Sequence, residues 1–328
     1  MSVKDAVELL LRSGASLVSA HEHAGSELVH HREGVEHRYQ QSVDTLMGLL
    51  RSVARQHIGA AVGPVGALVL PMPFYRALKP QGAPVDPATC TDVIRQRNLR
   101  LLDDCARYRD RHGPDGGVPM AAALVDPFRS AEDFAAELRH RRDEIFALKW
   151  HPPALESPVD DHVAAGYLDL SAEWNIPTVI HCSPTGRLGD LDEIRTHALP
   201  VAARAGVRVS IAHLAFLAPE LPTVLDQPGV FADLGPWEAV CERTVGRPDP
   251  ALADRRLACV MERNPDALMF SLDTPWHLQP WDDGRVLGAS VADAVTRVRA
   301  AGEMAGLDSA ALLHGTALRL LFGPGADA

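Results

Sequence analysis

Short apolar segments alternate with amphipathic helical segments along almost the whole chain, and this alternation most constrains the fold. Uniformly apolar strands are typical of a parallel sheet that helices cover on both faces. We expect strands at the segment containing His21 and His23 and at 66–70, 120–125, 145–150, 178–181, 207–213, 230–233 and 268–272. We expect helices at 4–13, 40–55, 89–109, 130–141, 160–174, 190–205, 249–263, 290–303 and 308–321. This order predicts the α/β class and a (β/α)8 TIM barrel.

The length of the chain fits one barrel, so we expect a single domain over residues 1–328. A doubly wound open sheet is the competing architecture, but no Gly-x-Gly-x-x-Gly turn follows the first strand. Residues 24–60 are the least regular part of the chain, and we interpret them as an insertion after the first strand and a candidate lid. Three histidines within it (His30, His31 and His37) could bind a second metal, but a solvent-exposed face is the simpler interpretation.

The charge of the chain argues against large anionic partners. It has 32 basic and 43 acidic residues, a formal net charge of -11, and no basic patch, so we expect neither nucleic acid nor a membrane surface as partner. Five cysteines without Cys-x-x-Cys spacing are unlike a disulfide framework, and no apolar run approaches the roughly 20 residues of a membrane span. We therefore expect a cytoplasmic protein with a small-molecule substrate, and a homodimer is possible.

Two histidines, His21 and His23, end the first apolar segment. Alternate side chains of a strand point to the same side, so these two imidazoles can bind one metal ion. With 15 histidines in 328 residues, chance supplies about 0.7 His-x-His pairs per chain, so the pair alone proves nothing.

The spacing of other strand-end polar residues makes a shared site plausible. Lys149, His181 and His213 are separated by 32 residues each, and Asp273 follows His213 by 60. One βα unit takes roughly 30 residues, so these residues end strands four, five, six and eight. All strands of a barrel run parallel, so their carboxyl ends meet at one mouth.

These segments together resemble the amidohydrolase superfamily. The resemblance lies in the order of 20–23 (AHEH), 148–152 (LKWHP), 179–181 (VIH), 211–214 (IAHL), 271–276 (SLDTPW) and 316–321 (TALRLL). It is closest to the amidohydrolase-related branch, which contains hydrolases, nonoxidative decarboxylases and hydratases. Ser19 departs from the family pattern, which has Asp there, and so does 314–316 (HGT), where Gly-Asn is usual.

The resemblance implies a metal site formed by His21, His23, His181 and Asp273. Three imidazoles, a carboxylate and an open position suit one catalytic zinc ion, and manganese or iron would fit the same ligands. A bound divalent ion lowers the pKa of water, and Asp273 would take the proton and pass it to the leaving group. His213 would act as electrophile or general acid, although a core histidine bonded to a backbone carbonyl is the alternative.

The state of Lys149 distinguishes a site for one metal ion from a site for two. In binuclear members of the superfamily this lysine is carboxylated and bridges two ions, with His181 and His213 then binding the second. We favour one ion, because the Lys149–His151–Pro152 stretch resembles the mononuclear branch. Lys149, His151 and Arg187 are then candidates for substrate binding or for a second metal.

We therefore expect a metal-dependent hydrolase acting on an amide, ester or lactone bond of a small molecule, which we expect to be carboxylated. A metal-dependent nonoxidative decarboxylase or carbon–carbon lyase is the alternative within enzymes, and a non-catalytic, metal-stabilised binding protein is the third. Trp237, Trp276 and His277 could line the mouth, but packing is the simpler role. Cys182 should point away from the site into the core.

Overall fold

The computed structural model describes residues 3–12, 14–30, 36–58, 63–72, 86–235, 250–274, 291–307 and 311–324. Within them, one sheet has the strand order β2-β1-β3-β4-β5-β6-β7-β8-β9. Its strands are β1 (Leu17–His30), β2 (Glu36–Gln41), β3 (Val65–Pro71), β4 (Val118–Leu124), β5 (Ile145–Trp150), β6 (Thr178–Ile180), β7 (Val209–Ile211), β8 (Val230–Asp233) and β9 (Leu268–Met269). All neighbours are parallel except β1 and β2. The sequential order excludes the doubly wound alternative, whose strand order reverses.

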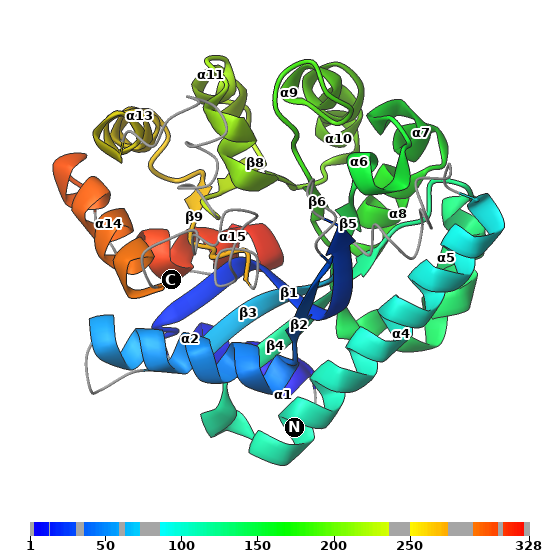
Figure 1. Cartoon of the computed structure of the whole chain (residues 1–328), viewed down its shortest axis with the longest axis horizontal. Coiled ribbons are helices and arrows are strands. Elements are labelled where there is room, and N and C mark those ends of the chain that lie inside the picture. Colours follow the sequence, from blue (N-terminus) through cyan, green and yellow to red (C-terminus); the bar gives the residue numbers. More distant parts are fainter. Residues whose placement is uncertain are drawn as a thin grey trace.

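Helices surround these strands, as Figure 1 shows. The α-helices are α1 (Val3–Arg12), α2 (Val43–His57), α4 (Pro87–His112), α5 (Ala131–Leu138), α6 (Pro152–Leu155), α7 (Val159–Ala164), α8 (Tyr167–Trp174), α9 (Leu191–Glu193), α10 (Leu199–Ala205), α11 (Leu221–Leu225), α13 (Pro250–Arg263), α14 (Val291–Met304) and α15 (Thr316–Phe322). Short 3-10 or π turns are η2 (Pro114–Gly116), η3 (Arg139–Glu144), η4 (Ile194–Ala198), η5 (Ala212–Leu217) and η6 (Ala311–Gly315). The predicted α/β alternation is confirmed, and the curled sheet is TIM-barrel-like.

Backbone hydrogen bonds join β1 to the segment that follows β9. Ala20 N donates to Phe270 O (2.9 Å), Asp273 N donates to His21 O (3.0 Å) and His23 N donates to Thr274 O (3.0 Å). We call these contacts between β1 and residues 270–274 the seam. Because the seam joins the first and last parallel strands, it brings His21 and His23 next to Asp273.

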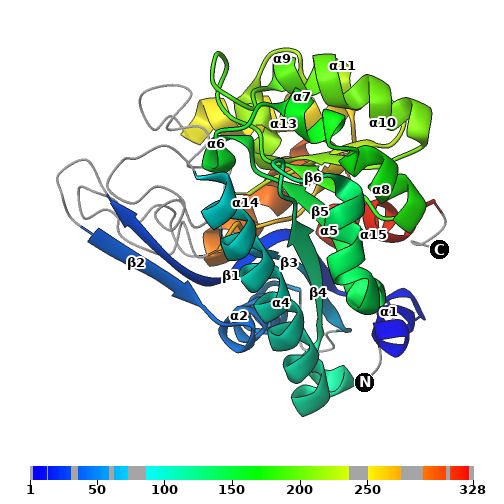
Figure 2. The same cartoon turned by 90° about the vertical axis from the view of Figure 1, so that its right-hand side faces the viewer.

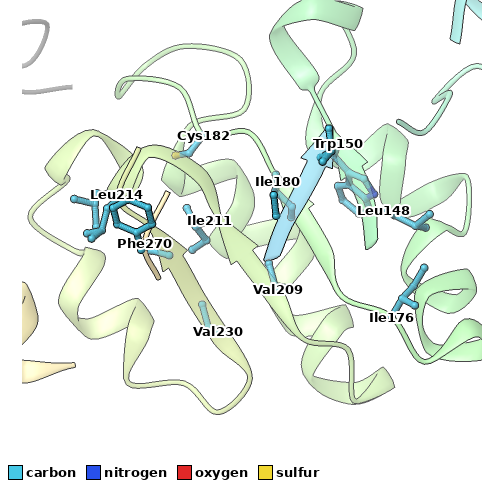
Figure 3. Close-up of a cluster of buried hydrophobic side chains, with 14 of the residues drawn as sticks. Leu148, Trp150, Ile176, Ile180, Cys182, Val209, Ile211, Leu214, Val230 and Phe270 are labelled. Atoms are coloured by element: carbon cyan, nitrogen blue, oxygen red, sulfur yellow. The ribbon is translucent and has the colours of Figure 1, made fainter. Parts of the chain in front are cut away.

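Alternation along the strands divides the core into two layers. In β3, Ala67 and Val69 pack with the surrounding helices, whereas Leu68 and Leu70 belong to a second cluster with Val118 and Met120. Figure 3 shows part of the outer layer, where Trp150, Ile180 and Ile211 lie among other buried side chains. Both faces of β3 and β4 are buried, as their apolar sequences predict.

Helix caps account for several of the helix boundaries. Ser42 accepts a hydrogen bond from Thr45 N (3.0 Å) ahead of α2, and Asp86 accepts one from Thr89 N (2.8 Å) ahead of α4. Gly206, which was expected to end the helix at 190–205, has φ +68 and caps α10.

Three sequence predictions need correction. The helix expected at 160–174 is broken into α7 and α8 because Gly166 has φ +89 between them. The strand expected at 207–213 is shorter (β7), and His213 instead begins a turn of five left-handed residues. The strand expected at 268–272 is paired with β8 only over Leu268–Met269, because the following residues bond to β1 instead.

The region expected as an insertion after the first strand has regular structure in its described parts. Strand β1 continues to His30 and pairs antiparallel with β2, and α2 follows. Figure 2 shows this hairpin projecting at the opposite end from α1. Residues 31–35, which include His31, and residues 59–60 lie outside the described part. The role of 24–60 as an insertion and lid therefore stays a prediction.

Helix α1 lies at the other end of the barrel-like sheet, and it corresponds to the helix expected at 4–13. Its Leu10 is fully buried and packs in the same cluster as Val118 and Met120. Among the described helices, none combines the length and the apolar character that crossing a bilayer requires.

Glu22 reinforces the seam with its side chain. Its Oε1 accepts from Leu272 N (2.9 Å) and Ser19 Oγ (2.5 Å), and its Oε2 accepts from Thr274 N (2.9 Å) and Thr274 Oγ1 (2.5 Å). The carboxylate is completely buried. It therefore fixes both neighbours of Asp273 to β1.

Glu22→Gln is expected to lower the free energy of unfolding by about 1–3 kcal/mol, because an amide nitrogen would replace an oxygen that faces donors only. Urea unfolding followed by circular dichroism measures the loss. Glu193→Gln is the matched control, since Glu193 Oε2 also accepts from two backbone N–H groups (Val159, 3.3 Å, and Gly189, 3.2 Å) but is partly exposed, so water can replace them. An equal or smaller loss for Glu22→Gln than for Glu193→Gln would contradict this role.

Candidate metal centre

The carboxyl ends of the strands bring most of the predicted site residues together. His21 and His23 lie on β1, Lys149 on β5, and the remaining members follow the ends of their strands: His151, His181, His213 and Asp273. All are buried except His181, which is partly exposed. The predicted convergence of distant strand ends is therefore present in the fold.

Three acceptor atoms converge at the seam. His23 Nε2 lies 3.2 Å from Asp273 Oδ1, His21 Nε2 lies 3.6 Å from the same oxygen, and the two Nε2 atoms lie 3.2 Å apart. His21, His23 and Asp273 form a group whose ligand atoms could all contact one ion.

The outer nitrogens of these two imidazoles define their tautomers. His21 Nδ1 lies 3.0 Å from Asp233 Oδ2, and His23 Nδ1 lies 3.0 Å from Pro71 O. Both partners are acceptors, so both Nδ1 atoms carry a proton and donate. Each Nε2 of a neutral ring is then a lone pair.

Burial keeps these rings neutral. It lowers the pKa of His21 and lowers that of His23 to about 3, and the positive charge of Lys149 lowers both further. In the described part of the chain, Asp273 Oδ1 receives no hydrogen bond. Two lone pairs and a carboxylate oxygen therefore face one another, and a cation satisfies that arrangement.

Asp273 is held in an unusual backbone conformation. Its φ is +53, a left-handed value that a residue other than glycine adopts only where its surroundings enforce it. Leu272 and Thr274, on either side, are bound by Glu22. Burial raises the pKa of Asp273, although His21 and His213 oppose the shift.

His181 does not lie in the group formed by His21, His23 and Asp273. Its Nδ1 is 3.0 Å from His213 Nε2, and its ring stacks on that of His151 with centroids 4.1 Å apart. Its role as a ligand stays a prediction.

His213 is oriented by the backbone after β8. Its Nδ1 donates to Gly235 O (2.6 Å), so Nε2 of the neutral ring is a lone pair. Burial lowers the pKa of His213 to about 4. The predicted electrophilic role therefore requires a second proton on the ring, which the lowered pKa disfavours at neutral pH.

Lys149 is buried near this cluster. Its Nζ is buried and has no hydrogen-bond partner among the residues that the structure describes. Burial lowers its pKa to about 8, although Asp233 and Asp273 favour the charged form. Asp233 and Asp273 are thus the carboxylates whose charges act on this amine.

Two buried carboxylates of the site are not among the residues predicted from the sequence. Asp233 ends β8, a short apolar strand, and lies between His213 and Asp273 in the chain, so its strand-end position was the available signal. Glu22 lies between the two histidines. The residues around it in the sequence do not indicate its burial, because its backbone partners Leu272 and Thr274 are 250 and 252 residues away. Burial raises the pKa of Glu22 to about 7, although its four hydrogen bonds oppose the shift.

The remaining predicted residues lie apart from the cluster or outside the described part. Arg187 is exposed on the turn between β6 and α9, so its role in substrate binding stays a prediction. Trp237, Trp276 and His277 fall outside the described residues. Cys182 is fully buried in the outer core, as predicted, and burial raises the pKa of its thiol (Figure 3).

Several solved structures share this fold. An amidohydrolase from Burkholderia multivorans has a TM-score of 0.58 and 16% identity, covering 93% of this chain and 98% of its own. The chain has the amidohydrolase fold. A dihydroorotase from Campylobacter jejuni has a TM-score of 0.54 and 14% identity, covering 93% of this chain and 82% of its own. A 5-carboxyvanillate decarboxylase from Novosphingobium aromaticivorans, in complex with manganese, has a TM-score of 0.52 and 13% identity, covering 94% and 97%.

One further structure of the Burkholderia amidohydrolase contains bound zinc, with a TM-score of 0.56 and 16% identity over 93% of this chain and 98% of that one. No family model matches the sequence, and no curated protein matches it. The expected resemblance to amidohydrolases is thus confirmed at the level of the fold.

The metal-free protein is expected to lose stability when the pH falls from 7 to 5. Five mouth histidines have lowered pKa values in the folded state (His21, His23, His151, His181 and His213). In the unfolded chain they bind protons near pH 6.5, so acid favours unfolding, and one histidine with a folded pKa near 3 contributes a loss of about 2 kcal/mol over this interval. Glu22, whose raised pKa favours the folded state in acid, offsets part of this loss.

Urea unfolding of chelator-treated protein at the two pH values measures this change. The five imidazoles outnumber the carboxyl groups whose pKa burial raises (Glu22, Asp126 and Asp273), so the midpoint should be lower at pH 5. A midpoint at pH 5 equal to or above that at pH 7 would show that these histidines are not held neutral.

Proposed function

We propose that this chain is a member of the amidohydrolase superfamily and a metal-dependent hydrolase acting on an amide, ester or lactone bond of a small, carboxylated molecule. The observation that carries the proposal is the convergence of His21 Nε2, His23 Nε2 and Asp273 Oδ1 within 3.2–3.6 Å of one another. All three are acceptors, and a shared cation is what such a set requires.

The ligands of the ion would be His21, His23 and Asp273, with His181 as the fourth on the family pattern. Imidazole and carboxylate ligands suit zinc, and also manganese or iron. A divalent ion supplies Lewis acidity there, polarising a carbonyl oxygen and lowering the pKa of water.

Asp273 is the proton carrier in this proposal. Its Oδ2 lies 3.7 Å from His213 Nδ1, and burial raises its pKa, so the carboxylate is a stronger base than an exposed aspartate. It would accept a proton from the attacking water and deliver it to the leaving group. Its fixed left-handed backbone keeps the carboxylate directed at the two histidines of β1.

Asp273→Asn is expected to lower kcat by about 10²–10⁴-fold, the range that proton transfer by a positioned side chain contributes. Turnover of a panel of carboxylated amides, esters and lactones by zinc- or manganese-loaded protein measures it. Asp126→Asn is the matched control, because Asp126 is a buried aspartate beyond the end of β4 that binds Thr91 Oγ1 (2.5 Å) and Phe128 N (3.1 Å) instead of a histidine. Unchanged kcat in the Asp273 variant would exclude the proton-transfer role, and a metal-binding protein without any turnover would be the non-catalytic alternative.

A binuclear site is the second candidate, and the environment of Lys149 favours it. Its buried amine lacks a partner among the described residues, and its lowered pKa increases the neutral fraction that can react with carbon dioxide. His181 Nδ1 and His213 Nε2 lie 3.0 Å apart beside it and could bind a second ion. Lys149 would then be carboxylated.

Metal analysis of the purified protein separates the two arrangements. We expect one equivalent per chain in the wild-type protein and in Lys149→Met, which keeps a similar length but cannot be carboxylated. Two equivalents in the wild-type protein, falling to one or none in Lys149→Met and increasing with added bicarbonate, would replace the mononuclear proposal with the binuclear one.

Nonoxidative decarboxylation is the alternative reaction. It is supported by the fold shared with a manganese-bound decarboxylase. Release of carbon dioxide from a carboxylated substrate, with no water added to the product, would assign this reaction in place of hydrolysis. Lys149 and Arg187 are the proposed anchors for the substrate carboxylate in both cases.

A further inference from the structure

Asp233 contacts the side of His21 that faces away from the proposed metal ligands. We propose that Asp233 is a positioning residue that fixes the tautomer of His21 and thereby its readiness to bind metal. The inference rests on the proposed function, because it concerns the same site. Asp233 itself touches neither the ion nor the substrate in this proposal.

The two side chains are in direct contact and are completely buried. Asp233 Oδ2 lies 3.0 Å from His21 Nδ1, and both side chains have no exposed surface. A carboxylate can only accept, so the Nδ1 proton is held there and Nε2 is left as the lone pair facing His23 and Asp273. Carboxylate partners of this kind orient metal-binding histidines and raise their basicity.

The second oxygen of Asp233 is held by the neighbouring strands. Oδ1 accepts from Ser271 Oγ (3.1 Å) and from the backbone N–H of His213 (3.3 Å). Ser271 Oγ in turn accepts from Gly235 N (2.7 Å). The carboxylate cannot rotate away from His21 without losing these donors.

The same network orients His213. Gly235 O accepts from His213 Nδ1 (2.6 Å), so one chain of contacts fixes two imidazoles. A Cβ at Gly235 would lie 2.6 Å from Ser271 Oγ and 3.0 Å from Asp273 N. Only glycine permits this close approach of the segment after β8 to the segment that carries Asp273.

The alternative is that Asp233 is itself a ligand, because it forms a possible group with His21 and His213. The two nitrogens of an imidazole point in opposite directions, however. His21 uses Nδ1 for Asp233 and directs Nε2 to Asp273, 3.6 Å away. An ion bound by His21, His23 and Asp273 therefore leaves Asp233 behind the ring, as a partner of the ligand.

Asp233→Asn separates positioning from packing. If the amide oxygen keeps the two donors at Oδ1, the amide nitrogen faces His21 Nδ1, which must then become the acceptor. The proton moves to Nε2, and the lone pair is lost from the metal side. If the amide is reversed, its nitrogen faces the hydroxyl of Ser271 and the N–H of His213. Asp126→Asn is the matched control, since its buried carboxylate contacts no histidine in the described part of the chain.

Two quantities are measured. Competition with a chromophoric chelator gives the zinc dissociation constant. NMR of the metal-free, ¹⁵N-histidine-labelled protein gives the tautomer of His21, with His21→Gln to assign its signals. We expect an Nδ1 proton in the wild-type protein, an Nε2 proton in Asp233→Asn, and zinc binding weakened about 10- to 100-fold. Asp126→Asn should change neither. Ser271→Ala, which removes one donor to Asp233, should weaken zinc binding to a smaller extent and decides the matter if Asp233→Asn does not fold.

Three results would overturn the inference: an Nε2 proton on His21 in the wild-type protein, unchanged zinc affinity in both Asp233→Asn and Ser271→Ala, or weaker binding in Asp233→Asn with the tautomer unchanged. The last result would show that Asp233 affects zinc binding by a route other than the tautomer of His21. Failure of the wild-type protein to bind any metal would instead refute the proposed function, and the tautomer measurement would still test the role of Asp233.

Discussion

The seam between β1 and residues 270–274 is the constraint on which the site depends. It closes the parallel sheet and also places His21 and His23 against Asp273. Buried Glu22 holds both neighbours of Asp273, so the geometry of the barrel and that of the proposed metal ligands are set by the same contacts. A cation bound there would contact both sides of the closure and would stabilise the folded state through binding.

The protonation states of the ionisable groups at the carboxyl ends of the strands depend on their burial next to one another. Neutral imidazoles direct lone pairs inward because carbonyl and carboxylate acceptors hold their outer protons. Lys149 contributes a positive charge that lowers the pKa of the histidines. The same charge and the hydrogen bond from His21 lower the pKa of Asp233, against the opposing effect of burial. The two carboxylates thus have separate positions: Asp273 faces the Nε2 atoms of His21 and His23, and Asp233 faces Nδ1 of His21.

Periodicity in the sequence was sufficient to predict the alternation of strands and helices, because buried parallel strands are uniformly apolar. The roughly 30-residue spacing likewise located His21, His23, Lys149, His213 and Asp273 at one mouth. Local patterns did not reveal the break at Gly166 or the turn that begins at His213, since these depend on left-handed backbone conformations. Glu22 and Asp233 were missed because their roles are defined by partners that are distant in the chain.

The turn from His213 to Leu217 has a consequence for how the protein folds. Five consecutive residues other than glycine have φ between 45 and 60, at a cost of roughly 1–2 kcal/mol each for L-amino acids. All five side chains are buried, so only the assembled core can offset that cost. The isolated segment would not favour this left-handed conformation. We therefore expect His213 to reach its final position late in folding, after the surrounding strands have formed.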